Sequence, residues 1–425
     1  MKSNFTRMLK VGRECVSRQC NYSSYRTPIL VSNISSYKTK CESIVGNSIA
    51  PPLSTFTPVR GLAQIGQNII ERPQLLTEAE RKDFMHVYQT IVKDLLEMPS
   101  MEDMKETNRW VERVLHYNVT HGKHIRGQTT AMAYKHFALG NLTNENMRLS
   151  YILGWCVEIL HAGFLLLDDI MDASETRRGR QCWYKVDNLG LTAINDGMLL
   201  ETSIYQILGK FFKDKNYFNQ ATKLIFDVMY QTVSGECLDL RTGKERMEKY
   251  TMERYTAVVK YKTSLYSIYL PFALAMTMAE IDDPALFQEV RSVALEMGHF
   301  LQARDDFLDC FGDVEITGKV GTDIETCKCS WLFVVAMENC SPEQKKLLME
   351  NYGQPEPEKV SVVKNLYDEL RLEDMYRQYE EQAYNSICTQ IQQMNNRLPK
   401  EVFLFMLHAN TAQVKTFVSN NKHIK

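Results

Sequence analysis

Residues 149–172 read LSYILGWCVEILHAGFLLLDDIMD, a largely apolar stretch that ends in three aspartates. Its apolar and small residues recur every three or four positions, which is the period of one face of an α-helix. These positions are Leu149, Ile152, Cys156, Ile159, Gly163, Leu166 and Ile170. The stretch predicts a long buried helix with carboxylates at its C-terminal end.

The sequence around this stretch favours helices as well. Residues 100–270 contain no proline, although the chain has 12. Proline is the main helix breaker, and the same region is rich in the strong helix formers Leu, Met, Glu and Lys. Alternating strand patterns are absent. We therefore predict an all-α protein, a large single-domain helical bundle whose helices cross a shared interior.

Composition narrows the class of protein. The 425 residues are 44% hydrophobic and 24% charged, with a formal net charge of −2. These values are ordinary for a globular chain and exclude a mostly disordered, collagen-like or coiled-coil protein. A near-neutral chain has no overall positive field that would attract a polyanion, so no nucleic-acid partner is expected. The eleven cysteines are scattered and odd in number, which predicts reduced thiols.

The N-terminus differs from the rest of the chain. Its first 40 residues are rich in serine and contain a single acid, Glu14. Their basic residues are Lys2, Arg7, Lys10, Arg13, Arg18, Arg26, Lys38 and Lys40. This composition predicts a mitochondrial transit peptide, and the alternative is a disordered tail on a cytoplasmic protein. Prolines at 51, 52 and 58 mark a linker, so we expect residues 1–65 to be leader and linker and 66–425 to form the domain.

One uncharged segment could suggest a membrane span. Residues 263–279 read TSLYSIYLPFALAMTMA. Their length lies at the lower limit for a transmembrane helix, and they include Pro271 and several hydroxyl groups. A buried helix explains the segment better, so no membrane span is expected.

The motif D-D-x-x-D occurs twice. The two triads are Asp168, Asp169, Asp172 and Asp305, Asp306, Asp309. On a helix, positions i and i+4 share a face, so the first and last aspartate of each triad point the same way. Carboxylates this close repel one another unless cations lie between them, and Mg²⁺ prefers carboxylate, water and phosphate oxygens. We predict that both triads bind Mg²⁺ with a diphosphate; the alternative is a solvated acidic turn, as in Asp282-Asp283-Pro284.

Basic residues accompany the triads. They are Arg177, Arg178 and Arg180 after the first triad, Lys319 and Lys328 after the second, and Lys123, Arg126 and Lys262 elsewhere. Arginine and lysine side chains around a metal cluster are what binding of a diphosphate requires. The chain has no G-x-x-x-x-G-K-[ST] loop, so these phosphates are not held as in P-loop enzymes.

Four blocks together resemble a known family. They are FLLLDDIMDASETRRG (164–179), LQARDDFLDCFGD (301–313), GKVGTDI (318–324) and KCSW (328–331). In this order they are similar to the trans-isoprenyl diphosphate synthases, above all to the farnesyl diphosphate synthases. The resemblance covers roughly residues 75–425. It implies an all-α bundle around a deep central cavity, usually a homodimer.

The resemblance also implies an activity: Mg²⁺-dependent, head-to-tail condensation of isopentenyl diphosphate with an allylic diphosphate. The product would be geranyl or farnesyl diphosphate. Both triads would hold Mg²⁺, three ions in all, bridging the allylic diphosphate. The residues implied to meet the allylic diphosphate are Arg177, Lys262, Thr263, Gln302, Lys319 and Lys328. Those implied for isopentenyl diphosphate are Lys123, Arg126, His161 and Arg178. Asp168, Asp169, Asp172, Arg177, Lys262 and Asp305 would carry catalysis.

The chain departs from the family pattern at several positions. Gly163 stands where an aromatic often closes the floor of the product pocket, next to the retained Phe164, so a longer product is expected unless another side chain fills the space. Glu236 stands where Gln is common, and Ile125 replaces an Asn before Arg126. The C-terminal residues 422–425 resemble the family's basic tail without its usual Arg. These changes predict a diverged paralogue.

Three alternatives compete with this interpretation. A terpene synthase derived from the same fold would ionise an allylic diphosphate without elongation, and would not need the four isopentenyl residues. A di-iron oxidase is suggested by Glu158-x-x-His161 and Glu296-x-x-His299. A non-catalytic partner subunit would have lost a triad, and both triads are complete.

Overall fold

The quoted stretch forms most of helix α6, which spans Asn144–Met171 in the computed structural model. Thr143 caps this helix by accepting a hydrogen bond from the Asn146 N–H. The structure describes residues 76–97, 104–138, 140–313, 317 and 320–411. The predicted leader and linker, Lys319 and the tail 422–425 lie outside the described residues, so the boundary at 65/66 stays a prediction.

The described residues are mostly helical, which confirms the predicted all-α fold. The main helices are α3 (Glu78–Leu96), α4 (Lys105–Val119), α5 (Ile125–Phe137), α6, α7 (Ala193–Phe212), α8 (Phe218–Thr242), α9 (Met252–Val259), α10 (Leu270–Met278), α11 (Pro284–Phe311), α13 (Trp331–Asn339), α14 (Pro342–Asn351), α15 (Pro357–Glu369), α16 (Leu372–Gln393) and α17 (Lys400–Thr411). Short 3₁₀ helices lie at Trp183–Asn188, Gly190–Thr192 and Met247–Lys249. The strands β1 (Thr176–Arg177) and β2 (Arg180–Gln181) form an antiparallel hairpin directly after the first aspartate triad.

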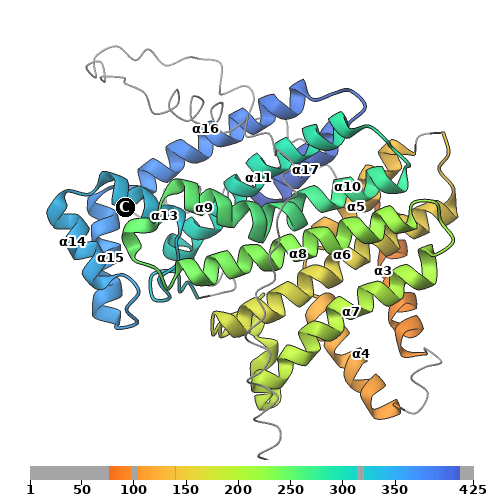
Figure 1. Cartoon of the computed structure of the whole chain (residues 1–425), viewed down its shortest axis with the longest axis horizontal. Coiled ribbons are helices and arrows are strands. Elements are labelled where there is room, and N and C mark those ends of the chain that lie inside the picture. The colour runs from red at the N-terminus through yellow and green to blue at the C-terminus, as the bar shows by residue number, and fades with distance from the viewer. Residues whose placement is uncertain (1–75, 98–103, 139, 314–316, 318–319, 412–425) are drawn as a thin grey trace, which may run out of the picture. The chain divides into compact units, whose positions relative to one another are not determined.

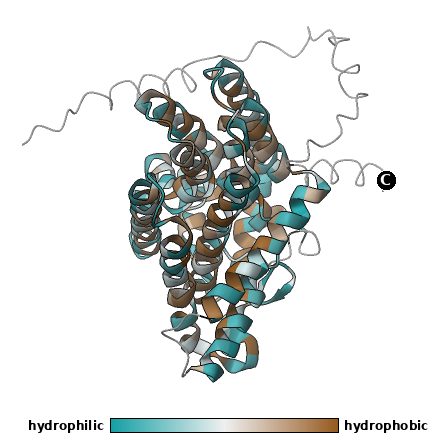
Figure 2. Ribbon diagram, turned by 90° about the vertical axis from the view of Figure 1, so that its right-hand side faces the viewer, coloured by the Kyte–Doolittle hydropathy of each residue, from teal (hydrophilic) through white to brown (hydrophobic). Residues whose placement is uncertain are grey.

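Two hydrophobic cores hold the helices together. The larger one gathers side chains from α3 to α8, from α10, from the first half of α11 and from α17, with Trp155 of α6 among its largest fully buried residues. The smaller one lies among α9, the end of α11, α13, α15 and α16, around Phe333 and Tyr376. Figure 1 shows the long helices of the first core beside one another, and Figure 2 shows single helices carrying both hydrophobic and hydrophilic residues. This amphipathic pattern is what a bundle of helices around a shared interior requires.

Helix α9 continues without a break through a π-helix, η5 (Lys260–Tyr269), into α10. Pro271 lies at the start of α10, and a proline inside a helix removes one N–H donor and crowds the preceding turn. The wider π-turns lie immediately before it. Wide turns of this kind are frequent at functional sites.

The uncharged segment 263–279 forms the later part of η5 and all of α10, and most of its residues are buried, as predicted for a helix of the interior. Only α6, among the described helices, is long and apolar enough to cross a membrane, and 89% of its apolar window is buried inside the protein. A helix buried in this way by other helices is typical of the core of a globular protein.

Candidate active site

A cavity of about 1080 Å³ lies between α6, α8, η5 and α11. Nearly all of the predicted site residues line it: Lys123, Arg126, His161, Phe164, Asp168, Asp172, Arg177, Arg178, Lys262, Thr263, Gln302, Asp305, Asp306, Asp309 and Lys328. Asp169 and Gly163 are not among its lining residues. Apolar side chains such as Leu167, Ile170 and Val258 complete the wall. The cavity thus combines a charged part with an apolar part.

Two glycines position η5 between the helices that carry the triads. A Cβ atom on Gly235 of α8 would lie 2.3 Å from the backbone nitrogen of Lys262. A Cβ atom on Gly298 of α11 would lie 2.0 Å from Oγ of Ser264. Any side chain at either position would push the helices apart. The two glycines therefore bring Lys262 and Thr263 of η5 against both α8 and α11.

The first triad divides its carboxylates between two sides of α6. Asp168 and Asp172, four residues apart, both face the cavity, as the helical period predicts. Asp168 Oδ1 lies 3.1 Å from Lys262 Nζ, and Asp172 Oδ1 lies 2.8 Å from Lys328 Nζ. Burial would raise the pKa of Asp168, but Lys262, Arg177 and Lys328 outweigh it and hold that pKa below its ordinary value.

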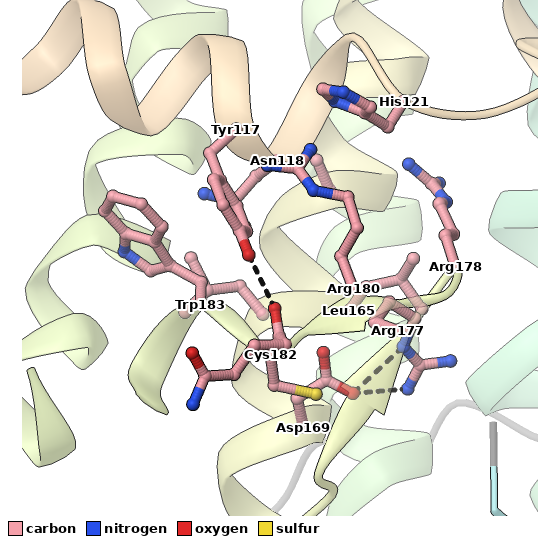
Figure 3. A pocket seen from close by; sticks show the side chains of 13 residues that line it. Tyr117, Asn118, His121, Leu165, Asp169, Arg177, Arg178, Arg180, Cys182 and Trp183 are labelled. Carbon is pink, nitrogen blue, oxygen red and sulfur yellow. Dashed lines mark hydrogen bonds and ion pairs between the residues drawn. The ribbon is translucent and has the colours of Figure 1, made fainter. Parts of the chain in front are cut away.

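Asp169 points to a smaller pocket beside the hairpin (Figure 3). Its Oδ1 accepts a hydrogen bond of 2.9 Å from Arg177 Nε, and its side chain is almost fully buried. Figure 3 shows Arg178 and Arg180 around the same pocket, whose free volume of about 30 Å³ has room for roughly one water molecule. In this structure Asp169 orients Arg177 and does not face the large cavity.

The second triad is joined to η5 by a chain of hydrogen bonds. Thr263 Oγ1 donates to Gln302 Oε1 at 3.0 Å, and Gln302 Nε2 donates to Asp306 Oδ1 at 3.0 Å. The backbone N–H of Trp331 donates to Asp306 Oδ2 at 2.8 Å. Burial raises the pKa of Asp306 to about 6, although these donors lower it. The hydrogen bond from Trp331 thereby holds the KCSW block against the second triad.

Lys262 lies at the centre of the charged part of the cavity. Its Nζ is 2.9 Å from Glu236 Oε2 and 2.8 Å from Asp239 Oδ2, in addition to its contact with Asp168. Asp239 Oδ2 also lies 3.1 Å from Lys328 Nζ. Burial would lower the pKa of Lys262, but the three carboxylates raise it well above its usual range. Both lysines are therefore charged and already paired with carboxylates.

The four residues predicted for isopentenyl diphosphate meet in the same cavity. Arg126 Nε donates to Ser267 Oγ at 3.0 Å, and its guanidinium lies 5.5 Å from the centre of the Tyr266 ring. His161 Nδ1 is 3.2 Å from the Tyr266 hydroxyl. Burial, together with Arg126 and Arg178, lowers the pKa of His161 well below its usual value, so its imidazole is neutral. Sequence reasoning missed Tyr266, which the spacing i+4 from Lys262 could have indicated.

Gly163 faces α7 and not open space. A Cβ atom there would lie 3.4 Å from Glu201 Cγ and 3.6 Å from Leu200 Cβ. Gly197 of α7 in turn accommodates Leu167, since a Cβ atom on it would lie 2.8 Å from that side chain. Helix α7 thus occupies the space beside residue 163 that an aromatic side chain would need. Glu201, whose pKa is raised by burial, lines the cavity at this point, and sequence reasoning did not identify it.

The Glu-x-x-His motifs have other partners. Glu158 Oε1 accepts a hydrogen bond of 2.7 Å from the Gly127 N–H, and His299 Nδ1 is 2.8 Å from the Tyr379 hydroxyl. Burial lowers the pKa of His299 to about 4. His161 lines the cavity, whereas His299 does not. The two motifs do not converge on one site, which argues against the di-iron alternative.

The charged part of the cavity fits Mg²⁺ by its donor set. Within the described ranges, no group of three or more His, Cys, Asp or Glu residues is close enough to hold a metal ion alone. Aspartates of both triads nevertheless line the cavity, and the buried Oε1 of Glu236 has no hydrogen-bond partner. Mg²⁺ typically takes one or two carboxylates and completes its shell with water and substrate phosphate oxygens. Asp168, Asp172, Asp305 and Asp309 are placed for such shared coordination.

Comparison with known proteins places this chain in a family. The polyprenyl synthetase family matches residues 108–370. Farnesyl pyrophosphate synthases of Gallus gallus and Murgantia histrionica are 44% and 43% identical, covering 78% and 79% of this chain and 91% and 83% of those proteins. A mitochondrial farnesyl pyrophosphate synthase 1 of Arabidopsis thaliana is 46% identical over 73% of this chain and 82% of that protein. The structure of T. brucei farnesyl diphosphate synthase complexed with risedronate matches 79% of this chain and 98% of that one, with a TM-score of 0.72 and 30% identity. The fold, the cavity and these similarities together show that the chain belongs to the polyprenyl synthetase family.

Proposed function

We propose that this protein elongates prenyl chains by joining isopentenyl diphosphate to an allylic diphosphate, with geranyl or farnesyl diphosphate as the product. The family and the farnesyl pyrophosphate synthase relatives support this activity. One structural observation carries it: aspartates from both triads and the four residues expected to bind isopentenyl diphosphate line one cavity that also has an apolar wall. A binding site for two diphosphates and a hydrocarbon chain needs all three features.

The reaction breaks the allylic C–O bond, and the diphosphate leaves with the electron pair. Bound Mg²⁺ would supply positive charge to the leaving group, and the family is generally Mg²⁺-dependent. Arg177, Lys262 and Lys328 add further positive charge on the same side of the cavity. The allylic cation then bonds to the terminal carbon of the isopentenyl double bond. The new bond leaves the positive charge on the inner carbon of the former double bond. The methylene group next to that carbon then loses a proton, which restores a double bond, and the departing diphosphate accepts the proton.

The second substrate is held by a separate group of residues. Lys123, Arg126 and Arg178 supply positive charge for its diphosphate, and neutral His161 supplies a hydrogen-bonding ring without adding charge. Holding both substrates in one cavity makes the bond-forming step effectively intramolecular. The apolar wall keeps water away from the cation, which water would quench. A terpene synthase would not need this second group, so its retention favours elongation.

Product analysis tests the proposal. The full chain is incubated with Mg²⁺ and isopentenyl plus dimethylallyl diphosphate, or with farnesyl diphosphate alone. We expect ten- and fifteen-carbon prenyl diphosphates from the first mixture and no new product from the second. Hydrocarbon or alcohol from the second mixture, without elongation in the first, would contradict elongation and support the terpene synthase alternative.

We further propose that the protein acts as a homodimer. Large apolar residues are exposed on α7, on α8 and on the 3₁₀ helix before α7: Leu191, Ile194, Met198, Tyr205, Tyr230 and Val233, of which Ile194 and Val233 also line the large cavity. Tyr205 of α7 and Phe226 of α8 are in ring contact, so the two helices lie next to each other. Patches of this kind on a monomer mark interaction sites. A second copy of the chain is the occupant that the family resemblance implies.

Localisation in mitochondria is a proposal that rests on the sequence of residues 1–40, which lie outside the described residues, and on the mitochondrial relative. A fusion of residues 1–65 to a fluorescent protein tests it. Import and cleavage in mitochondria would support a transit peptide. A uniformly cytoplasmic signal would contradict one.

A further inference from the structure

Glu236 is one of the carboxylates that surround Lys262, the lysine expected to bind the allylic diphosphate. Lys262 Nζ is surrounded by Asp168, Glu236 and Asp239 at 3.1, 2.9 and 2.8 Å. An ammonium group has three N–H donors, and here three carboxylates surround it. Lys328 is engaged in the same way by Asp172 and Asp239 at 2.8 and 3.1 Å.

The charges of this cluster do not balance. Among the described residues, the ion pairs around Arg177, Lys262 and Lys328 join three cations to five carboxylates. Glu236 is one of the five, and its Oε1 atom is buried without a hydrogen-bond partner. Its charge is therefore poorly screened by solvent, and it acts strongly on anything that binds nearby.

The backbone keeps Glu236 beside Lys262. The adjacent Gly235 packs directly against the backbone of Tyr261 and Lys262, with no room for even a methyl group between the two helices. The side chain of Glu236 is only about 15% exposed, so it cannot turn into solvent without leaving its wall of the cavity. The pairing of Glu236 with Lys262 is built into the contact of α8 with η5.

We propose that Glu236 makes capture of a diphosphate conditional on divalent cations. The inference rests on the proposed function and concerns the same site. Without divalent cations, an incoming diphosphate meets excess negative charge and a lysine whose positive charge is already offset by three carboxylates. Divalent cations at Asp168 and Asp172 offset this charge and withdraw those carboxylates from Lys262 and Lys328. Glutamine at this position would have the same size but would leave one carboxylate fewer on Lys262.

Titration calorimetry with inorganic pyrophosphate tests the proposal on the full chain, first in a chelator and then in saturating Mg²⁺. We expect Glu236→Gln to bind pyrophosphate about tenfold more tightly than the wild type in the chelator, the effect of roughly one nearby unit charge at intermediate dielectric. In Mg²⁺ the gain in affinity of Glu236→Gln over the wild type should fall below about threefold, because the cations already offset the charge of Glu236. An equal affinity of variant and wild type in the chelator, or an equal gain in both conditions, would overturn the proposal.

Glu201→Gln is the matched control, since Glu201 lines the same cavity but forms no ion pair among the described residues. We expect it to bind pyrophosphate as the wild type does. An equal gain for Glu201→Gln would assign the effect to the cavity as a whole and reject the role of Glu236. Glu236→Ala should change affinity in the same direction as Glu236→Gln, and thermal melting checks that each variant is folded. Failure of the wild type to bind pyrophosphate even in Mg²⁺ would instead count against the proposed function.

Discussion

Lys328 Nζ lies 2.8 Å from Asp172 Oδ1, although the two residues are 156 positions apart in the chain. Asp172 ends the first triad, and Lys328 begins the KCSW block that follows the second triad. Asp239 of α8 accepts from the same ammonium group at 3.1 Å. One lysine thus connects three separate segments on the diphosphate side of the cavity, and burial leaves this network little screened by solvent.

Replacement of this lysine should impair binding of the allylic substrate. In Lys328→Ala, Asp172 and Asp239 lose a shared cation. We expect KM for the allylic diphosphate to rise roughly 10- to 100-fold, the range for losing a hydrogen bond to a charged group. Lys346→Ala removes a solvent-exposed partner of Glu350 and should leave KM unchanged. Steady-state kinetics decide, and an unchanged KM for Lys328→Ala would remove this residue from the binding site.

Metal removal should abolish turnover. Chelation of divalent cations is expected to stop product formation, and added Mg²⁺ should restore it. Asp172→Asn should lower kcat by about 100-fold or more, as loss of one preorganised electrostatic group does. It should also raise the Mg²⁺ concentration needed for half-maximal activity. Full activity in chelator, or a normal Mg²⁺ dependence in Asp172→Asn, would show that the triad does not bind the ion.

His299 should make the protein less stable in acid. Burial lowers its pKa to about 4 in the folded state, below the ordinary value of 6.5, so between these values the unfolded chain binds more protons. Stability should therefore fall as pH decreases from 6.5 to 4, by about 3 kcal/mol from this residue. Denaturant titrations give the free energy of unfolding at each pH. The values for wild type and His299→Gln should converge at low pH, and their slopes against pH should differ. The exposed His86→Gln should follow the wild type; identical slopes for all three would exclude the effect.

Gly163 offers a test of product length. Ala at 163 fits, because its Cβ would make ordinary contacts with Glu201 and Leu200. Gly163→Phe must displace Glu201 toward the cavity, so we expect a shorter product and a lower melting temperature. Gly209→Ala on the same helix as Glu201 meets nothing within 4 Å and serves as the control. Chromatography of the products decides. An unchanged chain length in Gly163→Phe would show that this position does not limit the growing tail.

Charges on the exposed face of α7 and α8 should disrupt the proposed dimer. Met198→Glu combined with Tyr230→Glu places two carboxylates on apolar residues that are more than half exposed. Buried charge at an interface is strongly unfavourable, so the variant should elute as a monomer in size-exclusion chromatography with light scattering. Leu347→Glu alters an exposed apolar residue of α14 and should not change the mass. A monomeric wild type would refute the dimer.

The sequence alone identified the features that depend on local spacing. The helical period of residues 149–172, the absence of proline from 100 to 270 and the i, i+4 spacing within each triad are properties of neighbouring residues. They predicted α6, the all-α fold and the shared direction of Asp168 and Asp172 correctly. The blocks of sequence that resemble the family also identified a set of residues that line one cavity.

Only the tertiary structure decided how distant residues meet. The π-helix η5, the three carboxylates around Lys262, the turn of Asp169 away from the cavity and the packing of Gly163 against α7 all involve contacts between different helices. Such contacts depend on how closely two helices approach, which Gly235, Gly298 and Gly197 set through the side chains they lack. Periodicity in one segment carries no information about the atoms of another, so these features could not be read from spacing.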